Sequence, residues 1–146
     1  MAIKQLSVYL ENKPGKLAEA IGIVSGAGVN LRALSLADTL NFGIMRLITS
    51  DLEAAEKALS EKTAVRITDV IAVRMDDKSG GLYEILKVLE AAKVNIEYMY
   101  AFTAAAGSAC AVLRVDDVAR AESALAEAGI RSLGEEDLFE LLDEKQ

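Results

Sequence analysis

Histidine is absent from the 146-residue sequence, and cysteine and proline each occur only once. Without histidine the chain lacks the commonest general base, the serine–histidine–aspartate arrangement and most transition-metal sites. The lone cysteine, Cys110, excludes an intrachain disulfide, and its apolar neighbours favour a small buried residue over a reactive thiol. No nucleophile and base stand at an identifiable spacing. We therefore expect a protein that is not an enzyme, with no catalytic residues, no metal site and no cofactor.

Long apolar runs are also missing. No stretch approaches the length that spans a membrane, and Met1–Gln5 lacks the charged and apolar regions of a signal peptide. A hydrophobic fraction of 52% with so little proline is typical of a well-packed globular protein. These features predict a cytoplasmic protein with no membrane partner.

Negative charge predominates, with a net charge of −7 that is unevenly distributed. Residues 1–68 carry eight Lys or Arg and seven Asp or Glu, whereas residues 69–146 carry eight and sixteen. The first half is therefore near +1 and the second near −8. An acidic chain without a basic stripe repels phosphate backbones, so we expect no nucleic-acid partner.

The most informative stretch is the turn Asn12–Leu17, which ends an alternating strand at Ile3–Glu11 and opens an amphipathic helix. Pro14 presets a helical φ in the expected first turn, and Gly15 allows another group to approach the backbone. A helix N-terminus with free N–H groups results, which suits a carboxylate or a phosphate. Many ordinary strand-to-helix turns share these features, so a single copy leaves a purely structural role open.

The same turn occurs a second time, at Asp77–Leu82. Shared spacing at both the turn and a later Val-Asn pair makes a chance similarity between unrelated units improbable, and a fixed period of this length indicates a duplicated domain. At a spacing of 65, Lys13, Gly15, Leu17, Val29 and Asn30 correspond to Lys78, Gly80, Leu82, Val94 and Asn95.

Each copy is predicted to contain the elements β-α-β-β-α-β. In the first copy, the second and third strands are expected at Val29–Ala37 and Phe42–Thr49, and Ser50 and Glu53 stand at the spacing of a capping box for the second helix. In the second copy, Asp117 is expected to cap the corresponding helix, and a short terminal helix is expected at Glu135–Leu142. Two helices on one face of a four-stranded antiparallel sheet form a ferredoxin-like α+β fold, here with domains 1–68 and 69–146.

A strand, then Asn/Asp-x-Pro-Gly-x-Leu opening a helix, then Gly-Val-Asn opening a second strand, resembles the ACT domain. The resemblance spans nearly the whole chain as two copies. It implies a regulatory module that binds an amino acid, with domains associated side by side and ligands held between paired domains. The first loop would supply backbone amides, and the second strand of the facing domain would supply the other wall.

The resemblance carries over to two sets of ligand-binding residues. Two departures occur in the second copy: Ser79 replaces the proline, and Lys93 replaces the glycine before Val-Asn. Ser79 is still expected to cap its helix, but the second loop is less preorganised, and Asp77 adds a negative charge where a carboxylate would sit. The first set is Asn12, Lys13, Pro14, Gly15, Lys16, Leu17, Val29, Asn30 and Leu31; the second is Asp77, Lys78, Ser79, Gly80, Gly81, Leu82, Val94, Asn95 and Ile96.

We expect Asn30 and Asn95 to be polar specificity elements, since asparagine is disfavoured in strands yet occurs twice at the same position. The alternative is local: an asparagine at a helix-to-strand junction bonds the nearby backbone and shapes the turn. For the whole protein, the leading hypothesis is an amino-acid-sensing regulatory homodimer that modulates a metabolic enzyme or pathway. The alternative is a ligand-free interaction module that docks on a partner enzyme.

Overall fold

A computed structural model describes residues 2–39, 41–76, 78–103 and 108–143. The chain divides into two compact units, one made of residues 4–68 and the other of residues 1–3 and 69–146. Each unit contains one copy of the repeat, and the two are described separately below.

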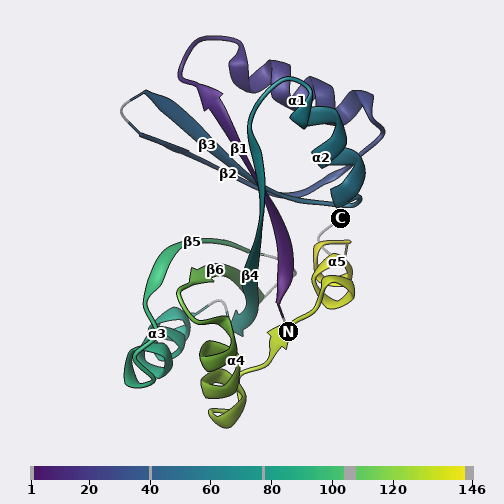
Figure 1. Ribbon diagram of the computed structural model, residues 1–146. Helices are drawn as coiled ribbons and strands as arrows, with labels where there is room; N and C mark the ends of the chain where they lie inside the picture. Colours follow the sequence, from purple (N-terminus) through teal and green to yellow (C-terminus); the bar gives the residue numbers. More distant parts are fainter. Residues whose placement is uncertain (1, 40, 77, 104–107, 144–146) are drawn as a thin grey trace. The chain divides into compact units, whose positions relative to one another are not determined.

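The first unit has two helices and an antiparallel sheet with the strand order β2-β3-β1-β4. Strand β1 pairs antiparallel with β3, from Leu6 opposite Leu47 to Glu11 opposite Phe42, and β2 pairs antiparallel with β3. Helices α1 and α2 lie side by side over this sheet (Figure 1). The elements are β1 (Ile3–Glu11), α1 (Lys16–Gly26), β2 (Leu31–Asp38), β3 (Phe42–Thr49), α2 (Leu52–Ser60) and the first part of β4 (Val65–Asp76).

The second unit repeats this order from the second part of β4 onward, which confirms the ferredoxin-like α+β class. Its strands lie in the order β5-β6-β4-β7, and helices α3 and α4 pack against each other (Figure 1). The terminal helix expected from the sequence is present, and the last strand is reduced to two residues. The elements are α3 (Gly81–Ala91), β5 (Ile96–Thr103), β6 (Ser108–Val115), α4 (Val118–Glu127), β7 (Ser132–Leu133) and α5 (Glu135–Asp143).

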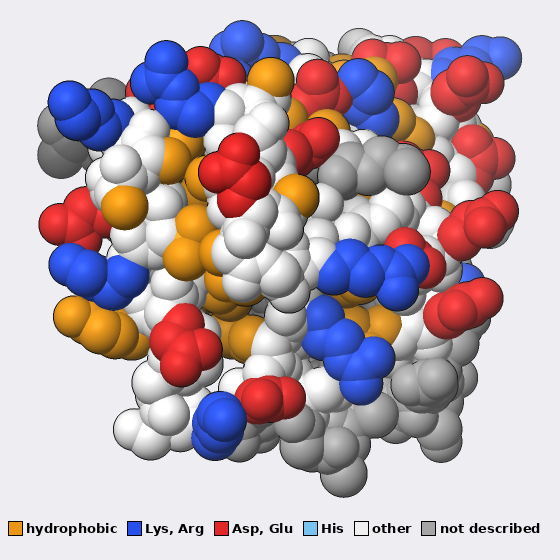
Figure 2. All heavy atoms as spheres, turned by 90° about the horizontal axis from the view of Figure 1, so that it is seen from below, with side chains coloured by type: hydrophobic (Ala, Val, Ile, Leu, Met, Phe, Trp, Pro, Cys, Tyr) orange, Lys and Arg blue, Asp and Glu red, His pale blue; other side chains and the backbone are white. Residues whose placement is uncertain are grey.

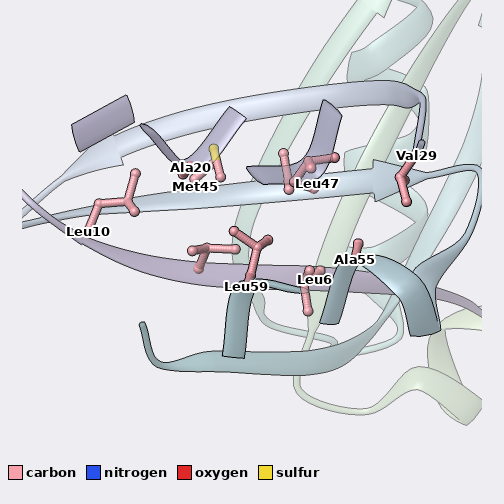
Figure 3. Packing of buried hydrophobic residues seen from close by; sticks show 10 residues of the cluster. Leu6, Leu10, Ala20, Val29, Met45, Leu47, Ala55 and Leu59 are labelled. Atoms are coloured by element: carbon pink, nitrogen blue, oxygen red, sulfur yellow. The ribbon is translucent and has the colours of Figure 1, made fainter. Parts of the chain in front are cut away.

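Each unit has its own hydrophobic core between its helices and one face of its sheet. In the first unit, alternate residues of β1 supply this face, namely Leu6, Val8 and Leu10, as their spacing predicted (Figure 3). Leu47 of β3 and Leu59 of α2 pack against them. Fully burying one such side chain stabilises a fold by roughly 1.5–3 kcal/mol. The second core contains Ile71, Val73, Ile85, Leu89, Val94, Ala111, Leu113, Val115, Ala121 and Leu125.

Aspartates cap the second helix of each unit. The carboxylate of Asp51 accepts a hydrogen bond from the Ala54 N–H at 3.1 Å, and Asp117 accepts one from the Arg120 N–H at 3.1 Å. The prediction for Asp117 is confirmed. The capping box predicted at Ser50 is wrong, because Asp51, one residue later, takes the cap position.

The first helix of each unit ends at a residue in the left-handed region. In the first unit this residue is Gly28, with a φ of 75°, as expected for a helix C-terminus. In the second unit Lys93 stands at the same place with a φ of 59°. A side chain in this region is strained, because its Cβ crowds the backbone. The second copy therefore keeps the left-handed backbone conformation at this position, although lysine replaces the glycine.

Candidate functional site

The two predicted turns share one backbone geometry. The Lys16 N–H donates to the Lys13 carbonyl at 3.3 Å, and Gly15 has φ 87° and ψ −13°. These values describe a type II turn with Pro14 at its second position and glycine at its third. The helix begins at Lys16, so the expectation that Pro14 occupies its first turn is wrong. A proline φ near −65° suits both positions, and the positive φ of Gly15 places the turn before the helix.

The second turn reproduces this geometry without proline. The Gly81 N–H donates to the Lys78 carbonyl at 3.2 Å, and Gly80 has φ 90° and ψ −11°. Gly80, not Ser79, is the N-cap of α3, so the expected Ser79 cap is wrong. Asp77 lies outside the described residues. Ser79 in place of proline leaves the folded turn unchanged and affects only the freedom of the unfolded chain.

Helices α1 and α3 both begin without a side-chain cap. Their first intrahelical bonds run from the Glu19 N–H to the Gly15 carbonyl at 2.9 Å and from the Glu84 N–H to the Gly80 carbonyl at 3.1 Å. The amides that precede these bonds have no acceptor within the helix. Both helix N-termini therefore present partial positive charge at the turn, which favours an anionic group.

The lysines of both turns are held in exposed ion pairs. The Lys13 ammonium lies 2.9 Å from the Glu11 carboxylate, and the Lys78 ammonium lies 3.5 Å from that of Asp76. The hydrogen bond and the charge of Lys13 lower the pKa of Glu11, and Glu11 in turn raises the pKa of Lys13. Exposed pairs of this kind are weak because water and salt screen them, so a ligand carboxylate can compete for either lysine.

A cavity of about 250 Å³ adjoins the first turn. The predicted residues Asn12, Lys13 and Leu17 line it, together with Leu36 at the far end of β2. Its wall is therefore aliphatic, with charged groups at the rim, as is usual for small-molecule sites. Sequence reasoning missed four lining residues from the β2–β3 hairpin, namely Leu36, Ala37, Asp38 and Gly43.

The Val-Asn pairs lie at the other end of each sheet. Val29 and Val94 belong to the two cores, whereas Leu31 and Ile96 begin β2 and β5 and pack against these cores. Asn30 is exposed, and its backbone forms two hydrogen bonds with Ser50. The Asn30 carbonyl accepts from the Ser50 N–H at 2.9 Å, and the Asn30 N–H donates to the Ser50 hydroxyl oxygen at 3.0 Å.

Asn95 is likewise exposed and forms the equivalent two bonds with Asp116, at 3.1 and 3.0 Å. Within the described parts of the chain, the side-chain amides of Asn30 and Asn95 form no hydrogen bond. The local alternative, in which the asparagine side chain bonds nearby backbone, therefore has no hydrogen bond to support it.

The turn and the asparagine of one copy are not brought together. In the first unit Leu31 lies opposite Thr49, whereas Glu11, just before the turn, lies opposite Phe42 at the other end of β3. Helix α1 has eleven residues and thus spans about 16 Å between the two positions. A site that uses both elements must take the turn from one copy and the asparagine from another.

The second turn lines a larger cavity, of about 480 Å³, on the side of α3 and α5. Of the predicted site residues, Lys78 and Gly81 line it, and Leu82 packs against the core of the second unit. The remaining lining residues come from the end of β4, from Glu84 and Ile85 of α3, from residues 129–133 and from α5. Seen from below, the molecular surface carries Lys or Arg and Asp or Glu side chains interspersed with one another (Figure 2).

The described residues offer little support for nucleophilic catalysis, metal binding or a membrane-spanning helix. Cys110 is buried, and burial raises the pKa of its thiol to about 12, which disfavours a nucleophilic role. Within the described ranges, no three His, Cys, Asp or Glu side chains are grouped so as to hold a metal ion. None of the helices in these ranges has both the length and the apolar character needed to cross a bilayer.

Comparison with known proteins gives one family. The family model of the ACT domain pair matches residues 1–142. A crystal structure of a protein from Bacteroides thetaiotaomicron has 39% sequence identity and a TM-score of 0.89, with 97% of this chain and 98% of that chain covered. A search of curated proteins gives no match.

More distant structures share the fold. The regulatory subunit of aspartate kinase from Thermus thermophilus, in a ligand-free form, has 14% identity and a TM-score of 0.59, with coverage of 86% of this chain and 90% of that chain. Aspartokinase III of E. coli, in complex with lysine and aspartate, has 17% identity and a TM-score of 0.52, with coverage of 87% and 31%.

Proposed function

This chain belongs to the ACT domain family, and we propose that it is a regulatory protein that binds a free amino acid between the turn of one ACT domain and the second strand of another. The observation that carries the proposal is the cavity at the first turn, beside the uncapped N-terminus of α1. The facing domain is the second copy in the same chain or a copy in a second chain.

The chemistry of the first turn fits an amino acid. The free amides of α1 and the Lys13 ammonium suit the α-carboxylate, and the exposed amide oxygen of Asn30 or Asn95 from the facing copy suits the α-ammonium. Leu17 and Leu36 line the cavity and offer an apolar wall to the ligand side chain. This arrangement selects an amino acid with an aliphatic side chain.

Binding at such a junction links ligand concentration to domain association. A ligand held by two domains stabilises their association by its own binding free energy. We infer a cytoplasmic homodimer that uses this linkage to modulate a metabolic enzyme. The regulatory subunits of aspartate kinase have the same fold, which is compatible with this role.

The test is a thermal-shift screen of the twenty amino acids, followed by calorimetry on two matched variants. Leu36 and Leu34 are both half-exposed on β2, with relative exposures of 51% and 45%, but only Leu36 lines the cavity. Leu36→Ala should therefore weaken binding of the selected amino acid, while Leu34→Ala leaves it unchanged. Equal effects of the two variants would place the ligand elsewhere.

A ligand-free docking module is the second candidate function. It is favoured by the large apolar side chains exposed on the first unit, which include Leu34, Leu36 and Phe42. If none of the twenty amino acids raises the melting temperature, and a two-residue change such as Leu34→Ser with Phe42→Ser abolishes binding to a partner enzyme, the docking function replaces the sensing function.

A further inference from the structure

The first unit has a second cavity, which is lined by residues from β1, α1 and the segment that follows α2. We refer to it as the α1–α2 recess, and its volume is about 270 Å³. Leu10, Ala20 and Leu59, which belong to the first core, line it, so part of its wall is the hydrophobic core itself (Figure 3). Two exposed aromatic residues, Tyr9 and Phe42, also line it. The recess therefore offers an apolar surface to a ligand.

The segment that follows α2 is fixed by hydrogen bonds. The Lys62 and Thr63 N–H groups both donate to the Leu59 carbonyl at 3.0 Å. The Tyr9 N–H donates to the Ala64 carbonyl at 3.1 Å, and the Thr63 hydroxyl donates to the Tyr9 carbonyl. These bonds tie the segment to α2 and to β1. The backbone of Lys62 is thus preorganised at the recess, which lowers the entropic cost of binding there.

The charges of the α1–α2 recess leave one cation for a ligand. Two carboxylates line it, and each already has a partner. Glu19 lies 3.6 Å from the Lys16 ammonium, and Glu11 lies 2.9 Å from that of Lys13. Lys62 also lines the recess, and within the described ranges its ammonium forms no ion pair. An apolar wall with a single unpaired ammonium is complementary to an apolar molecule that carries one negative charge.

The second copy does not have these features. Strands β3 and β6 begin at Phe42 and Ser108, a spacing of 66, so a small polar residue stands in the place of the aromatic one. At the same spacing Ala128 stands in the place of Lys62. The exposed aromatic ring and the unpaired cation therefore belong to the first copy alone, although both copies share the turn and the fold.

We propose that the α1–α2 recess binds an apolar monocarboxylic acid, a molecule with one carboxylate, an apolar body about the size of one ring and no ammonium group. The carboxylate lies at the Lys62 ammonium, and the apolar body lies against Ala20, Ile23 and Phe42. A volume of about 270 Å³ accommodates such a body, because an apolar cavity of about 150 Å³ holds benzene. This ligand class goes beyond the amino acid of the proposed function and does not depend on it.

The test is an amide NMR titration of the full chain with phenylacetate and with isovalerate. At least one of the two acids should give saturable shifts at Ala20, Ile23 and Ala64 in the millimolar range. Its amide, phenylacetamide or isovaleramide, should bind at least about tenfold more weakly, since it loses a charge-assisted contact. If the amide bound equally well, the recess would accept an uncharged apolar group, such as a side chain of a partner protein, and the acid site would be overturned.

Matched variants test the contribution of each feature. Lys62→Gln should weaken binding of the acid about tenfold, whereas Lys57→Gln removes the same charge from an exposed position of α2 outside the recess and should leave binding unchanged. Phe42→Ala should also weaken binding, and Leu34→Ala, which shortens another exposed apolar side chain, should not. Equal effects within both pairs of variants would overturn the site.

The position of the shifts separates this inference from the proposed function. Absence of shifts at the α1–α2 recess with both acids would overturn the inference. Shifts confined to Lys13, Leu17 and Gly43 would place the acid in the cavity at the first turn, which overturns the inference and leaves the proposed function intact. If the acid binds at the recess and none of the twenty amino acids binds to the chain, the proposed function fails and this inference stands.

Discussion

Asn30 and Ser50 hold the two ends of the β2–β3 hairpin together through reciprocal hydrogen bonds: the Ser50 N–H donates to the Asn30 carbonyl at 2.9 Å, and the Asn30 N–H donates to the Ser50 hydroxyl oxygen at 3.0 Å. Only the backbone of Asn30 takes part. Asp116 replaces Ser50 opposite Asn95 and preserves both bonds. The side chain that holds this end of the hairpin together is thus that of the serine or the aspartate. The asparagine side chain remains available to a ligand.

Substitution of Asn30 separates ligand binding from stability. Asn30→Ala should cost about 1–3 kcal/mol of amino-acid binding, because a hydrogen bond to a charged ammonium is lost. The free energy of unfolding should hardly change, since the backbone bonds to Ser50 remain. Calorimetry and urea denaturation measure the two quantities, with Asn95→Ala as the companion variant. A loss of stability with unchanged affinity would assign the asparagine to the turn.

The position of Gly81 should not accept a side chain without a loss of stability, although the corresponding position in the first copy holds Lys16. Gly81→Ala should lower the free energy of unfolding by about 1–3 kcal/mol, the usual range for overpacking, because the new Cβ would lie 2.6 Å from the Asp76 carbonyl oxygen. Lys16→Ala is the matched control and should change stability much less. Chemical denaturation measures both. If the two variants had the same free energy of unfolding, the backbone at Asp76 would be able to shift without destabilising the fold.

Lys93 offers a stabilising substitution. Its φ of 59° is costly for any residue with a Cβ, and the first copy has Gly28 at the same place. Lys93→Gly should therefore raise the free energy of unfolding by about 1 kcal/mol, since the strain of the left-handed region is about 1–2 kcal/mol and glycine adds some unfolded-state entropy. The reverse change, Gly28→Lys, should destabilise. Thermal denaturation that ranks the two variants the other way would contradict this account.

The Glu11–Lys13 ion pair predicts the direction in which pH changes the stability of the fold. Lys13 lowers the pKa of Glu11 below the ordinary value of 4.5 for a glutamate, so the folded state binds this proton less readily than the unfolded state. The stabilising contribution is present above the unfolded pKa and is lost as the pH falls through the folded pKa. NMR titration of the Glu11 carboxyl should show a midpoint below 4.5. Lys13→Met should move the midpoint upward, and an unmoved midpoint would remove Lys13 as the cause.

The sequence predicts the fold because its strongest signals are local and occur twice. Leu6, Val8 and Leu10 alternate with polar neighbours, and the turn around Gly15 recurs around Gly80 at a fixed spacing. Such signals depend on few long-range contacts. Asp117 was equally clear as a helix cap, because it directly precedes an apolar stripe.

The sequence is less informative where one residue pattern fits two different local structures. Pro14 suits the first turn of a helix and the second position of a type II turn, and only the φ of Gly15 distinguishes them. Ser50 and Asp51 are both good caps, one residue apart. The Ser50 hydroxyl oxygen accepts a hydrogen bond from the Asn30 N–H, and Asp51 takes the cap position. Leu36 enters the first cavity through strand pairing, which no local pattern specifies.

Strand β4 serves two cores with one uninterrupted backbone. Val65 packs against the first core, and Ile71, Val73 and Met75 pack against or within the second. The boundary between the two units falls inside this strand, between Thr68 and Asp69. The two copies are therefore joined by a strand and not by a loop, so an insertion at the junction would have to be accommodated within regular secondary structure.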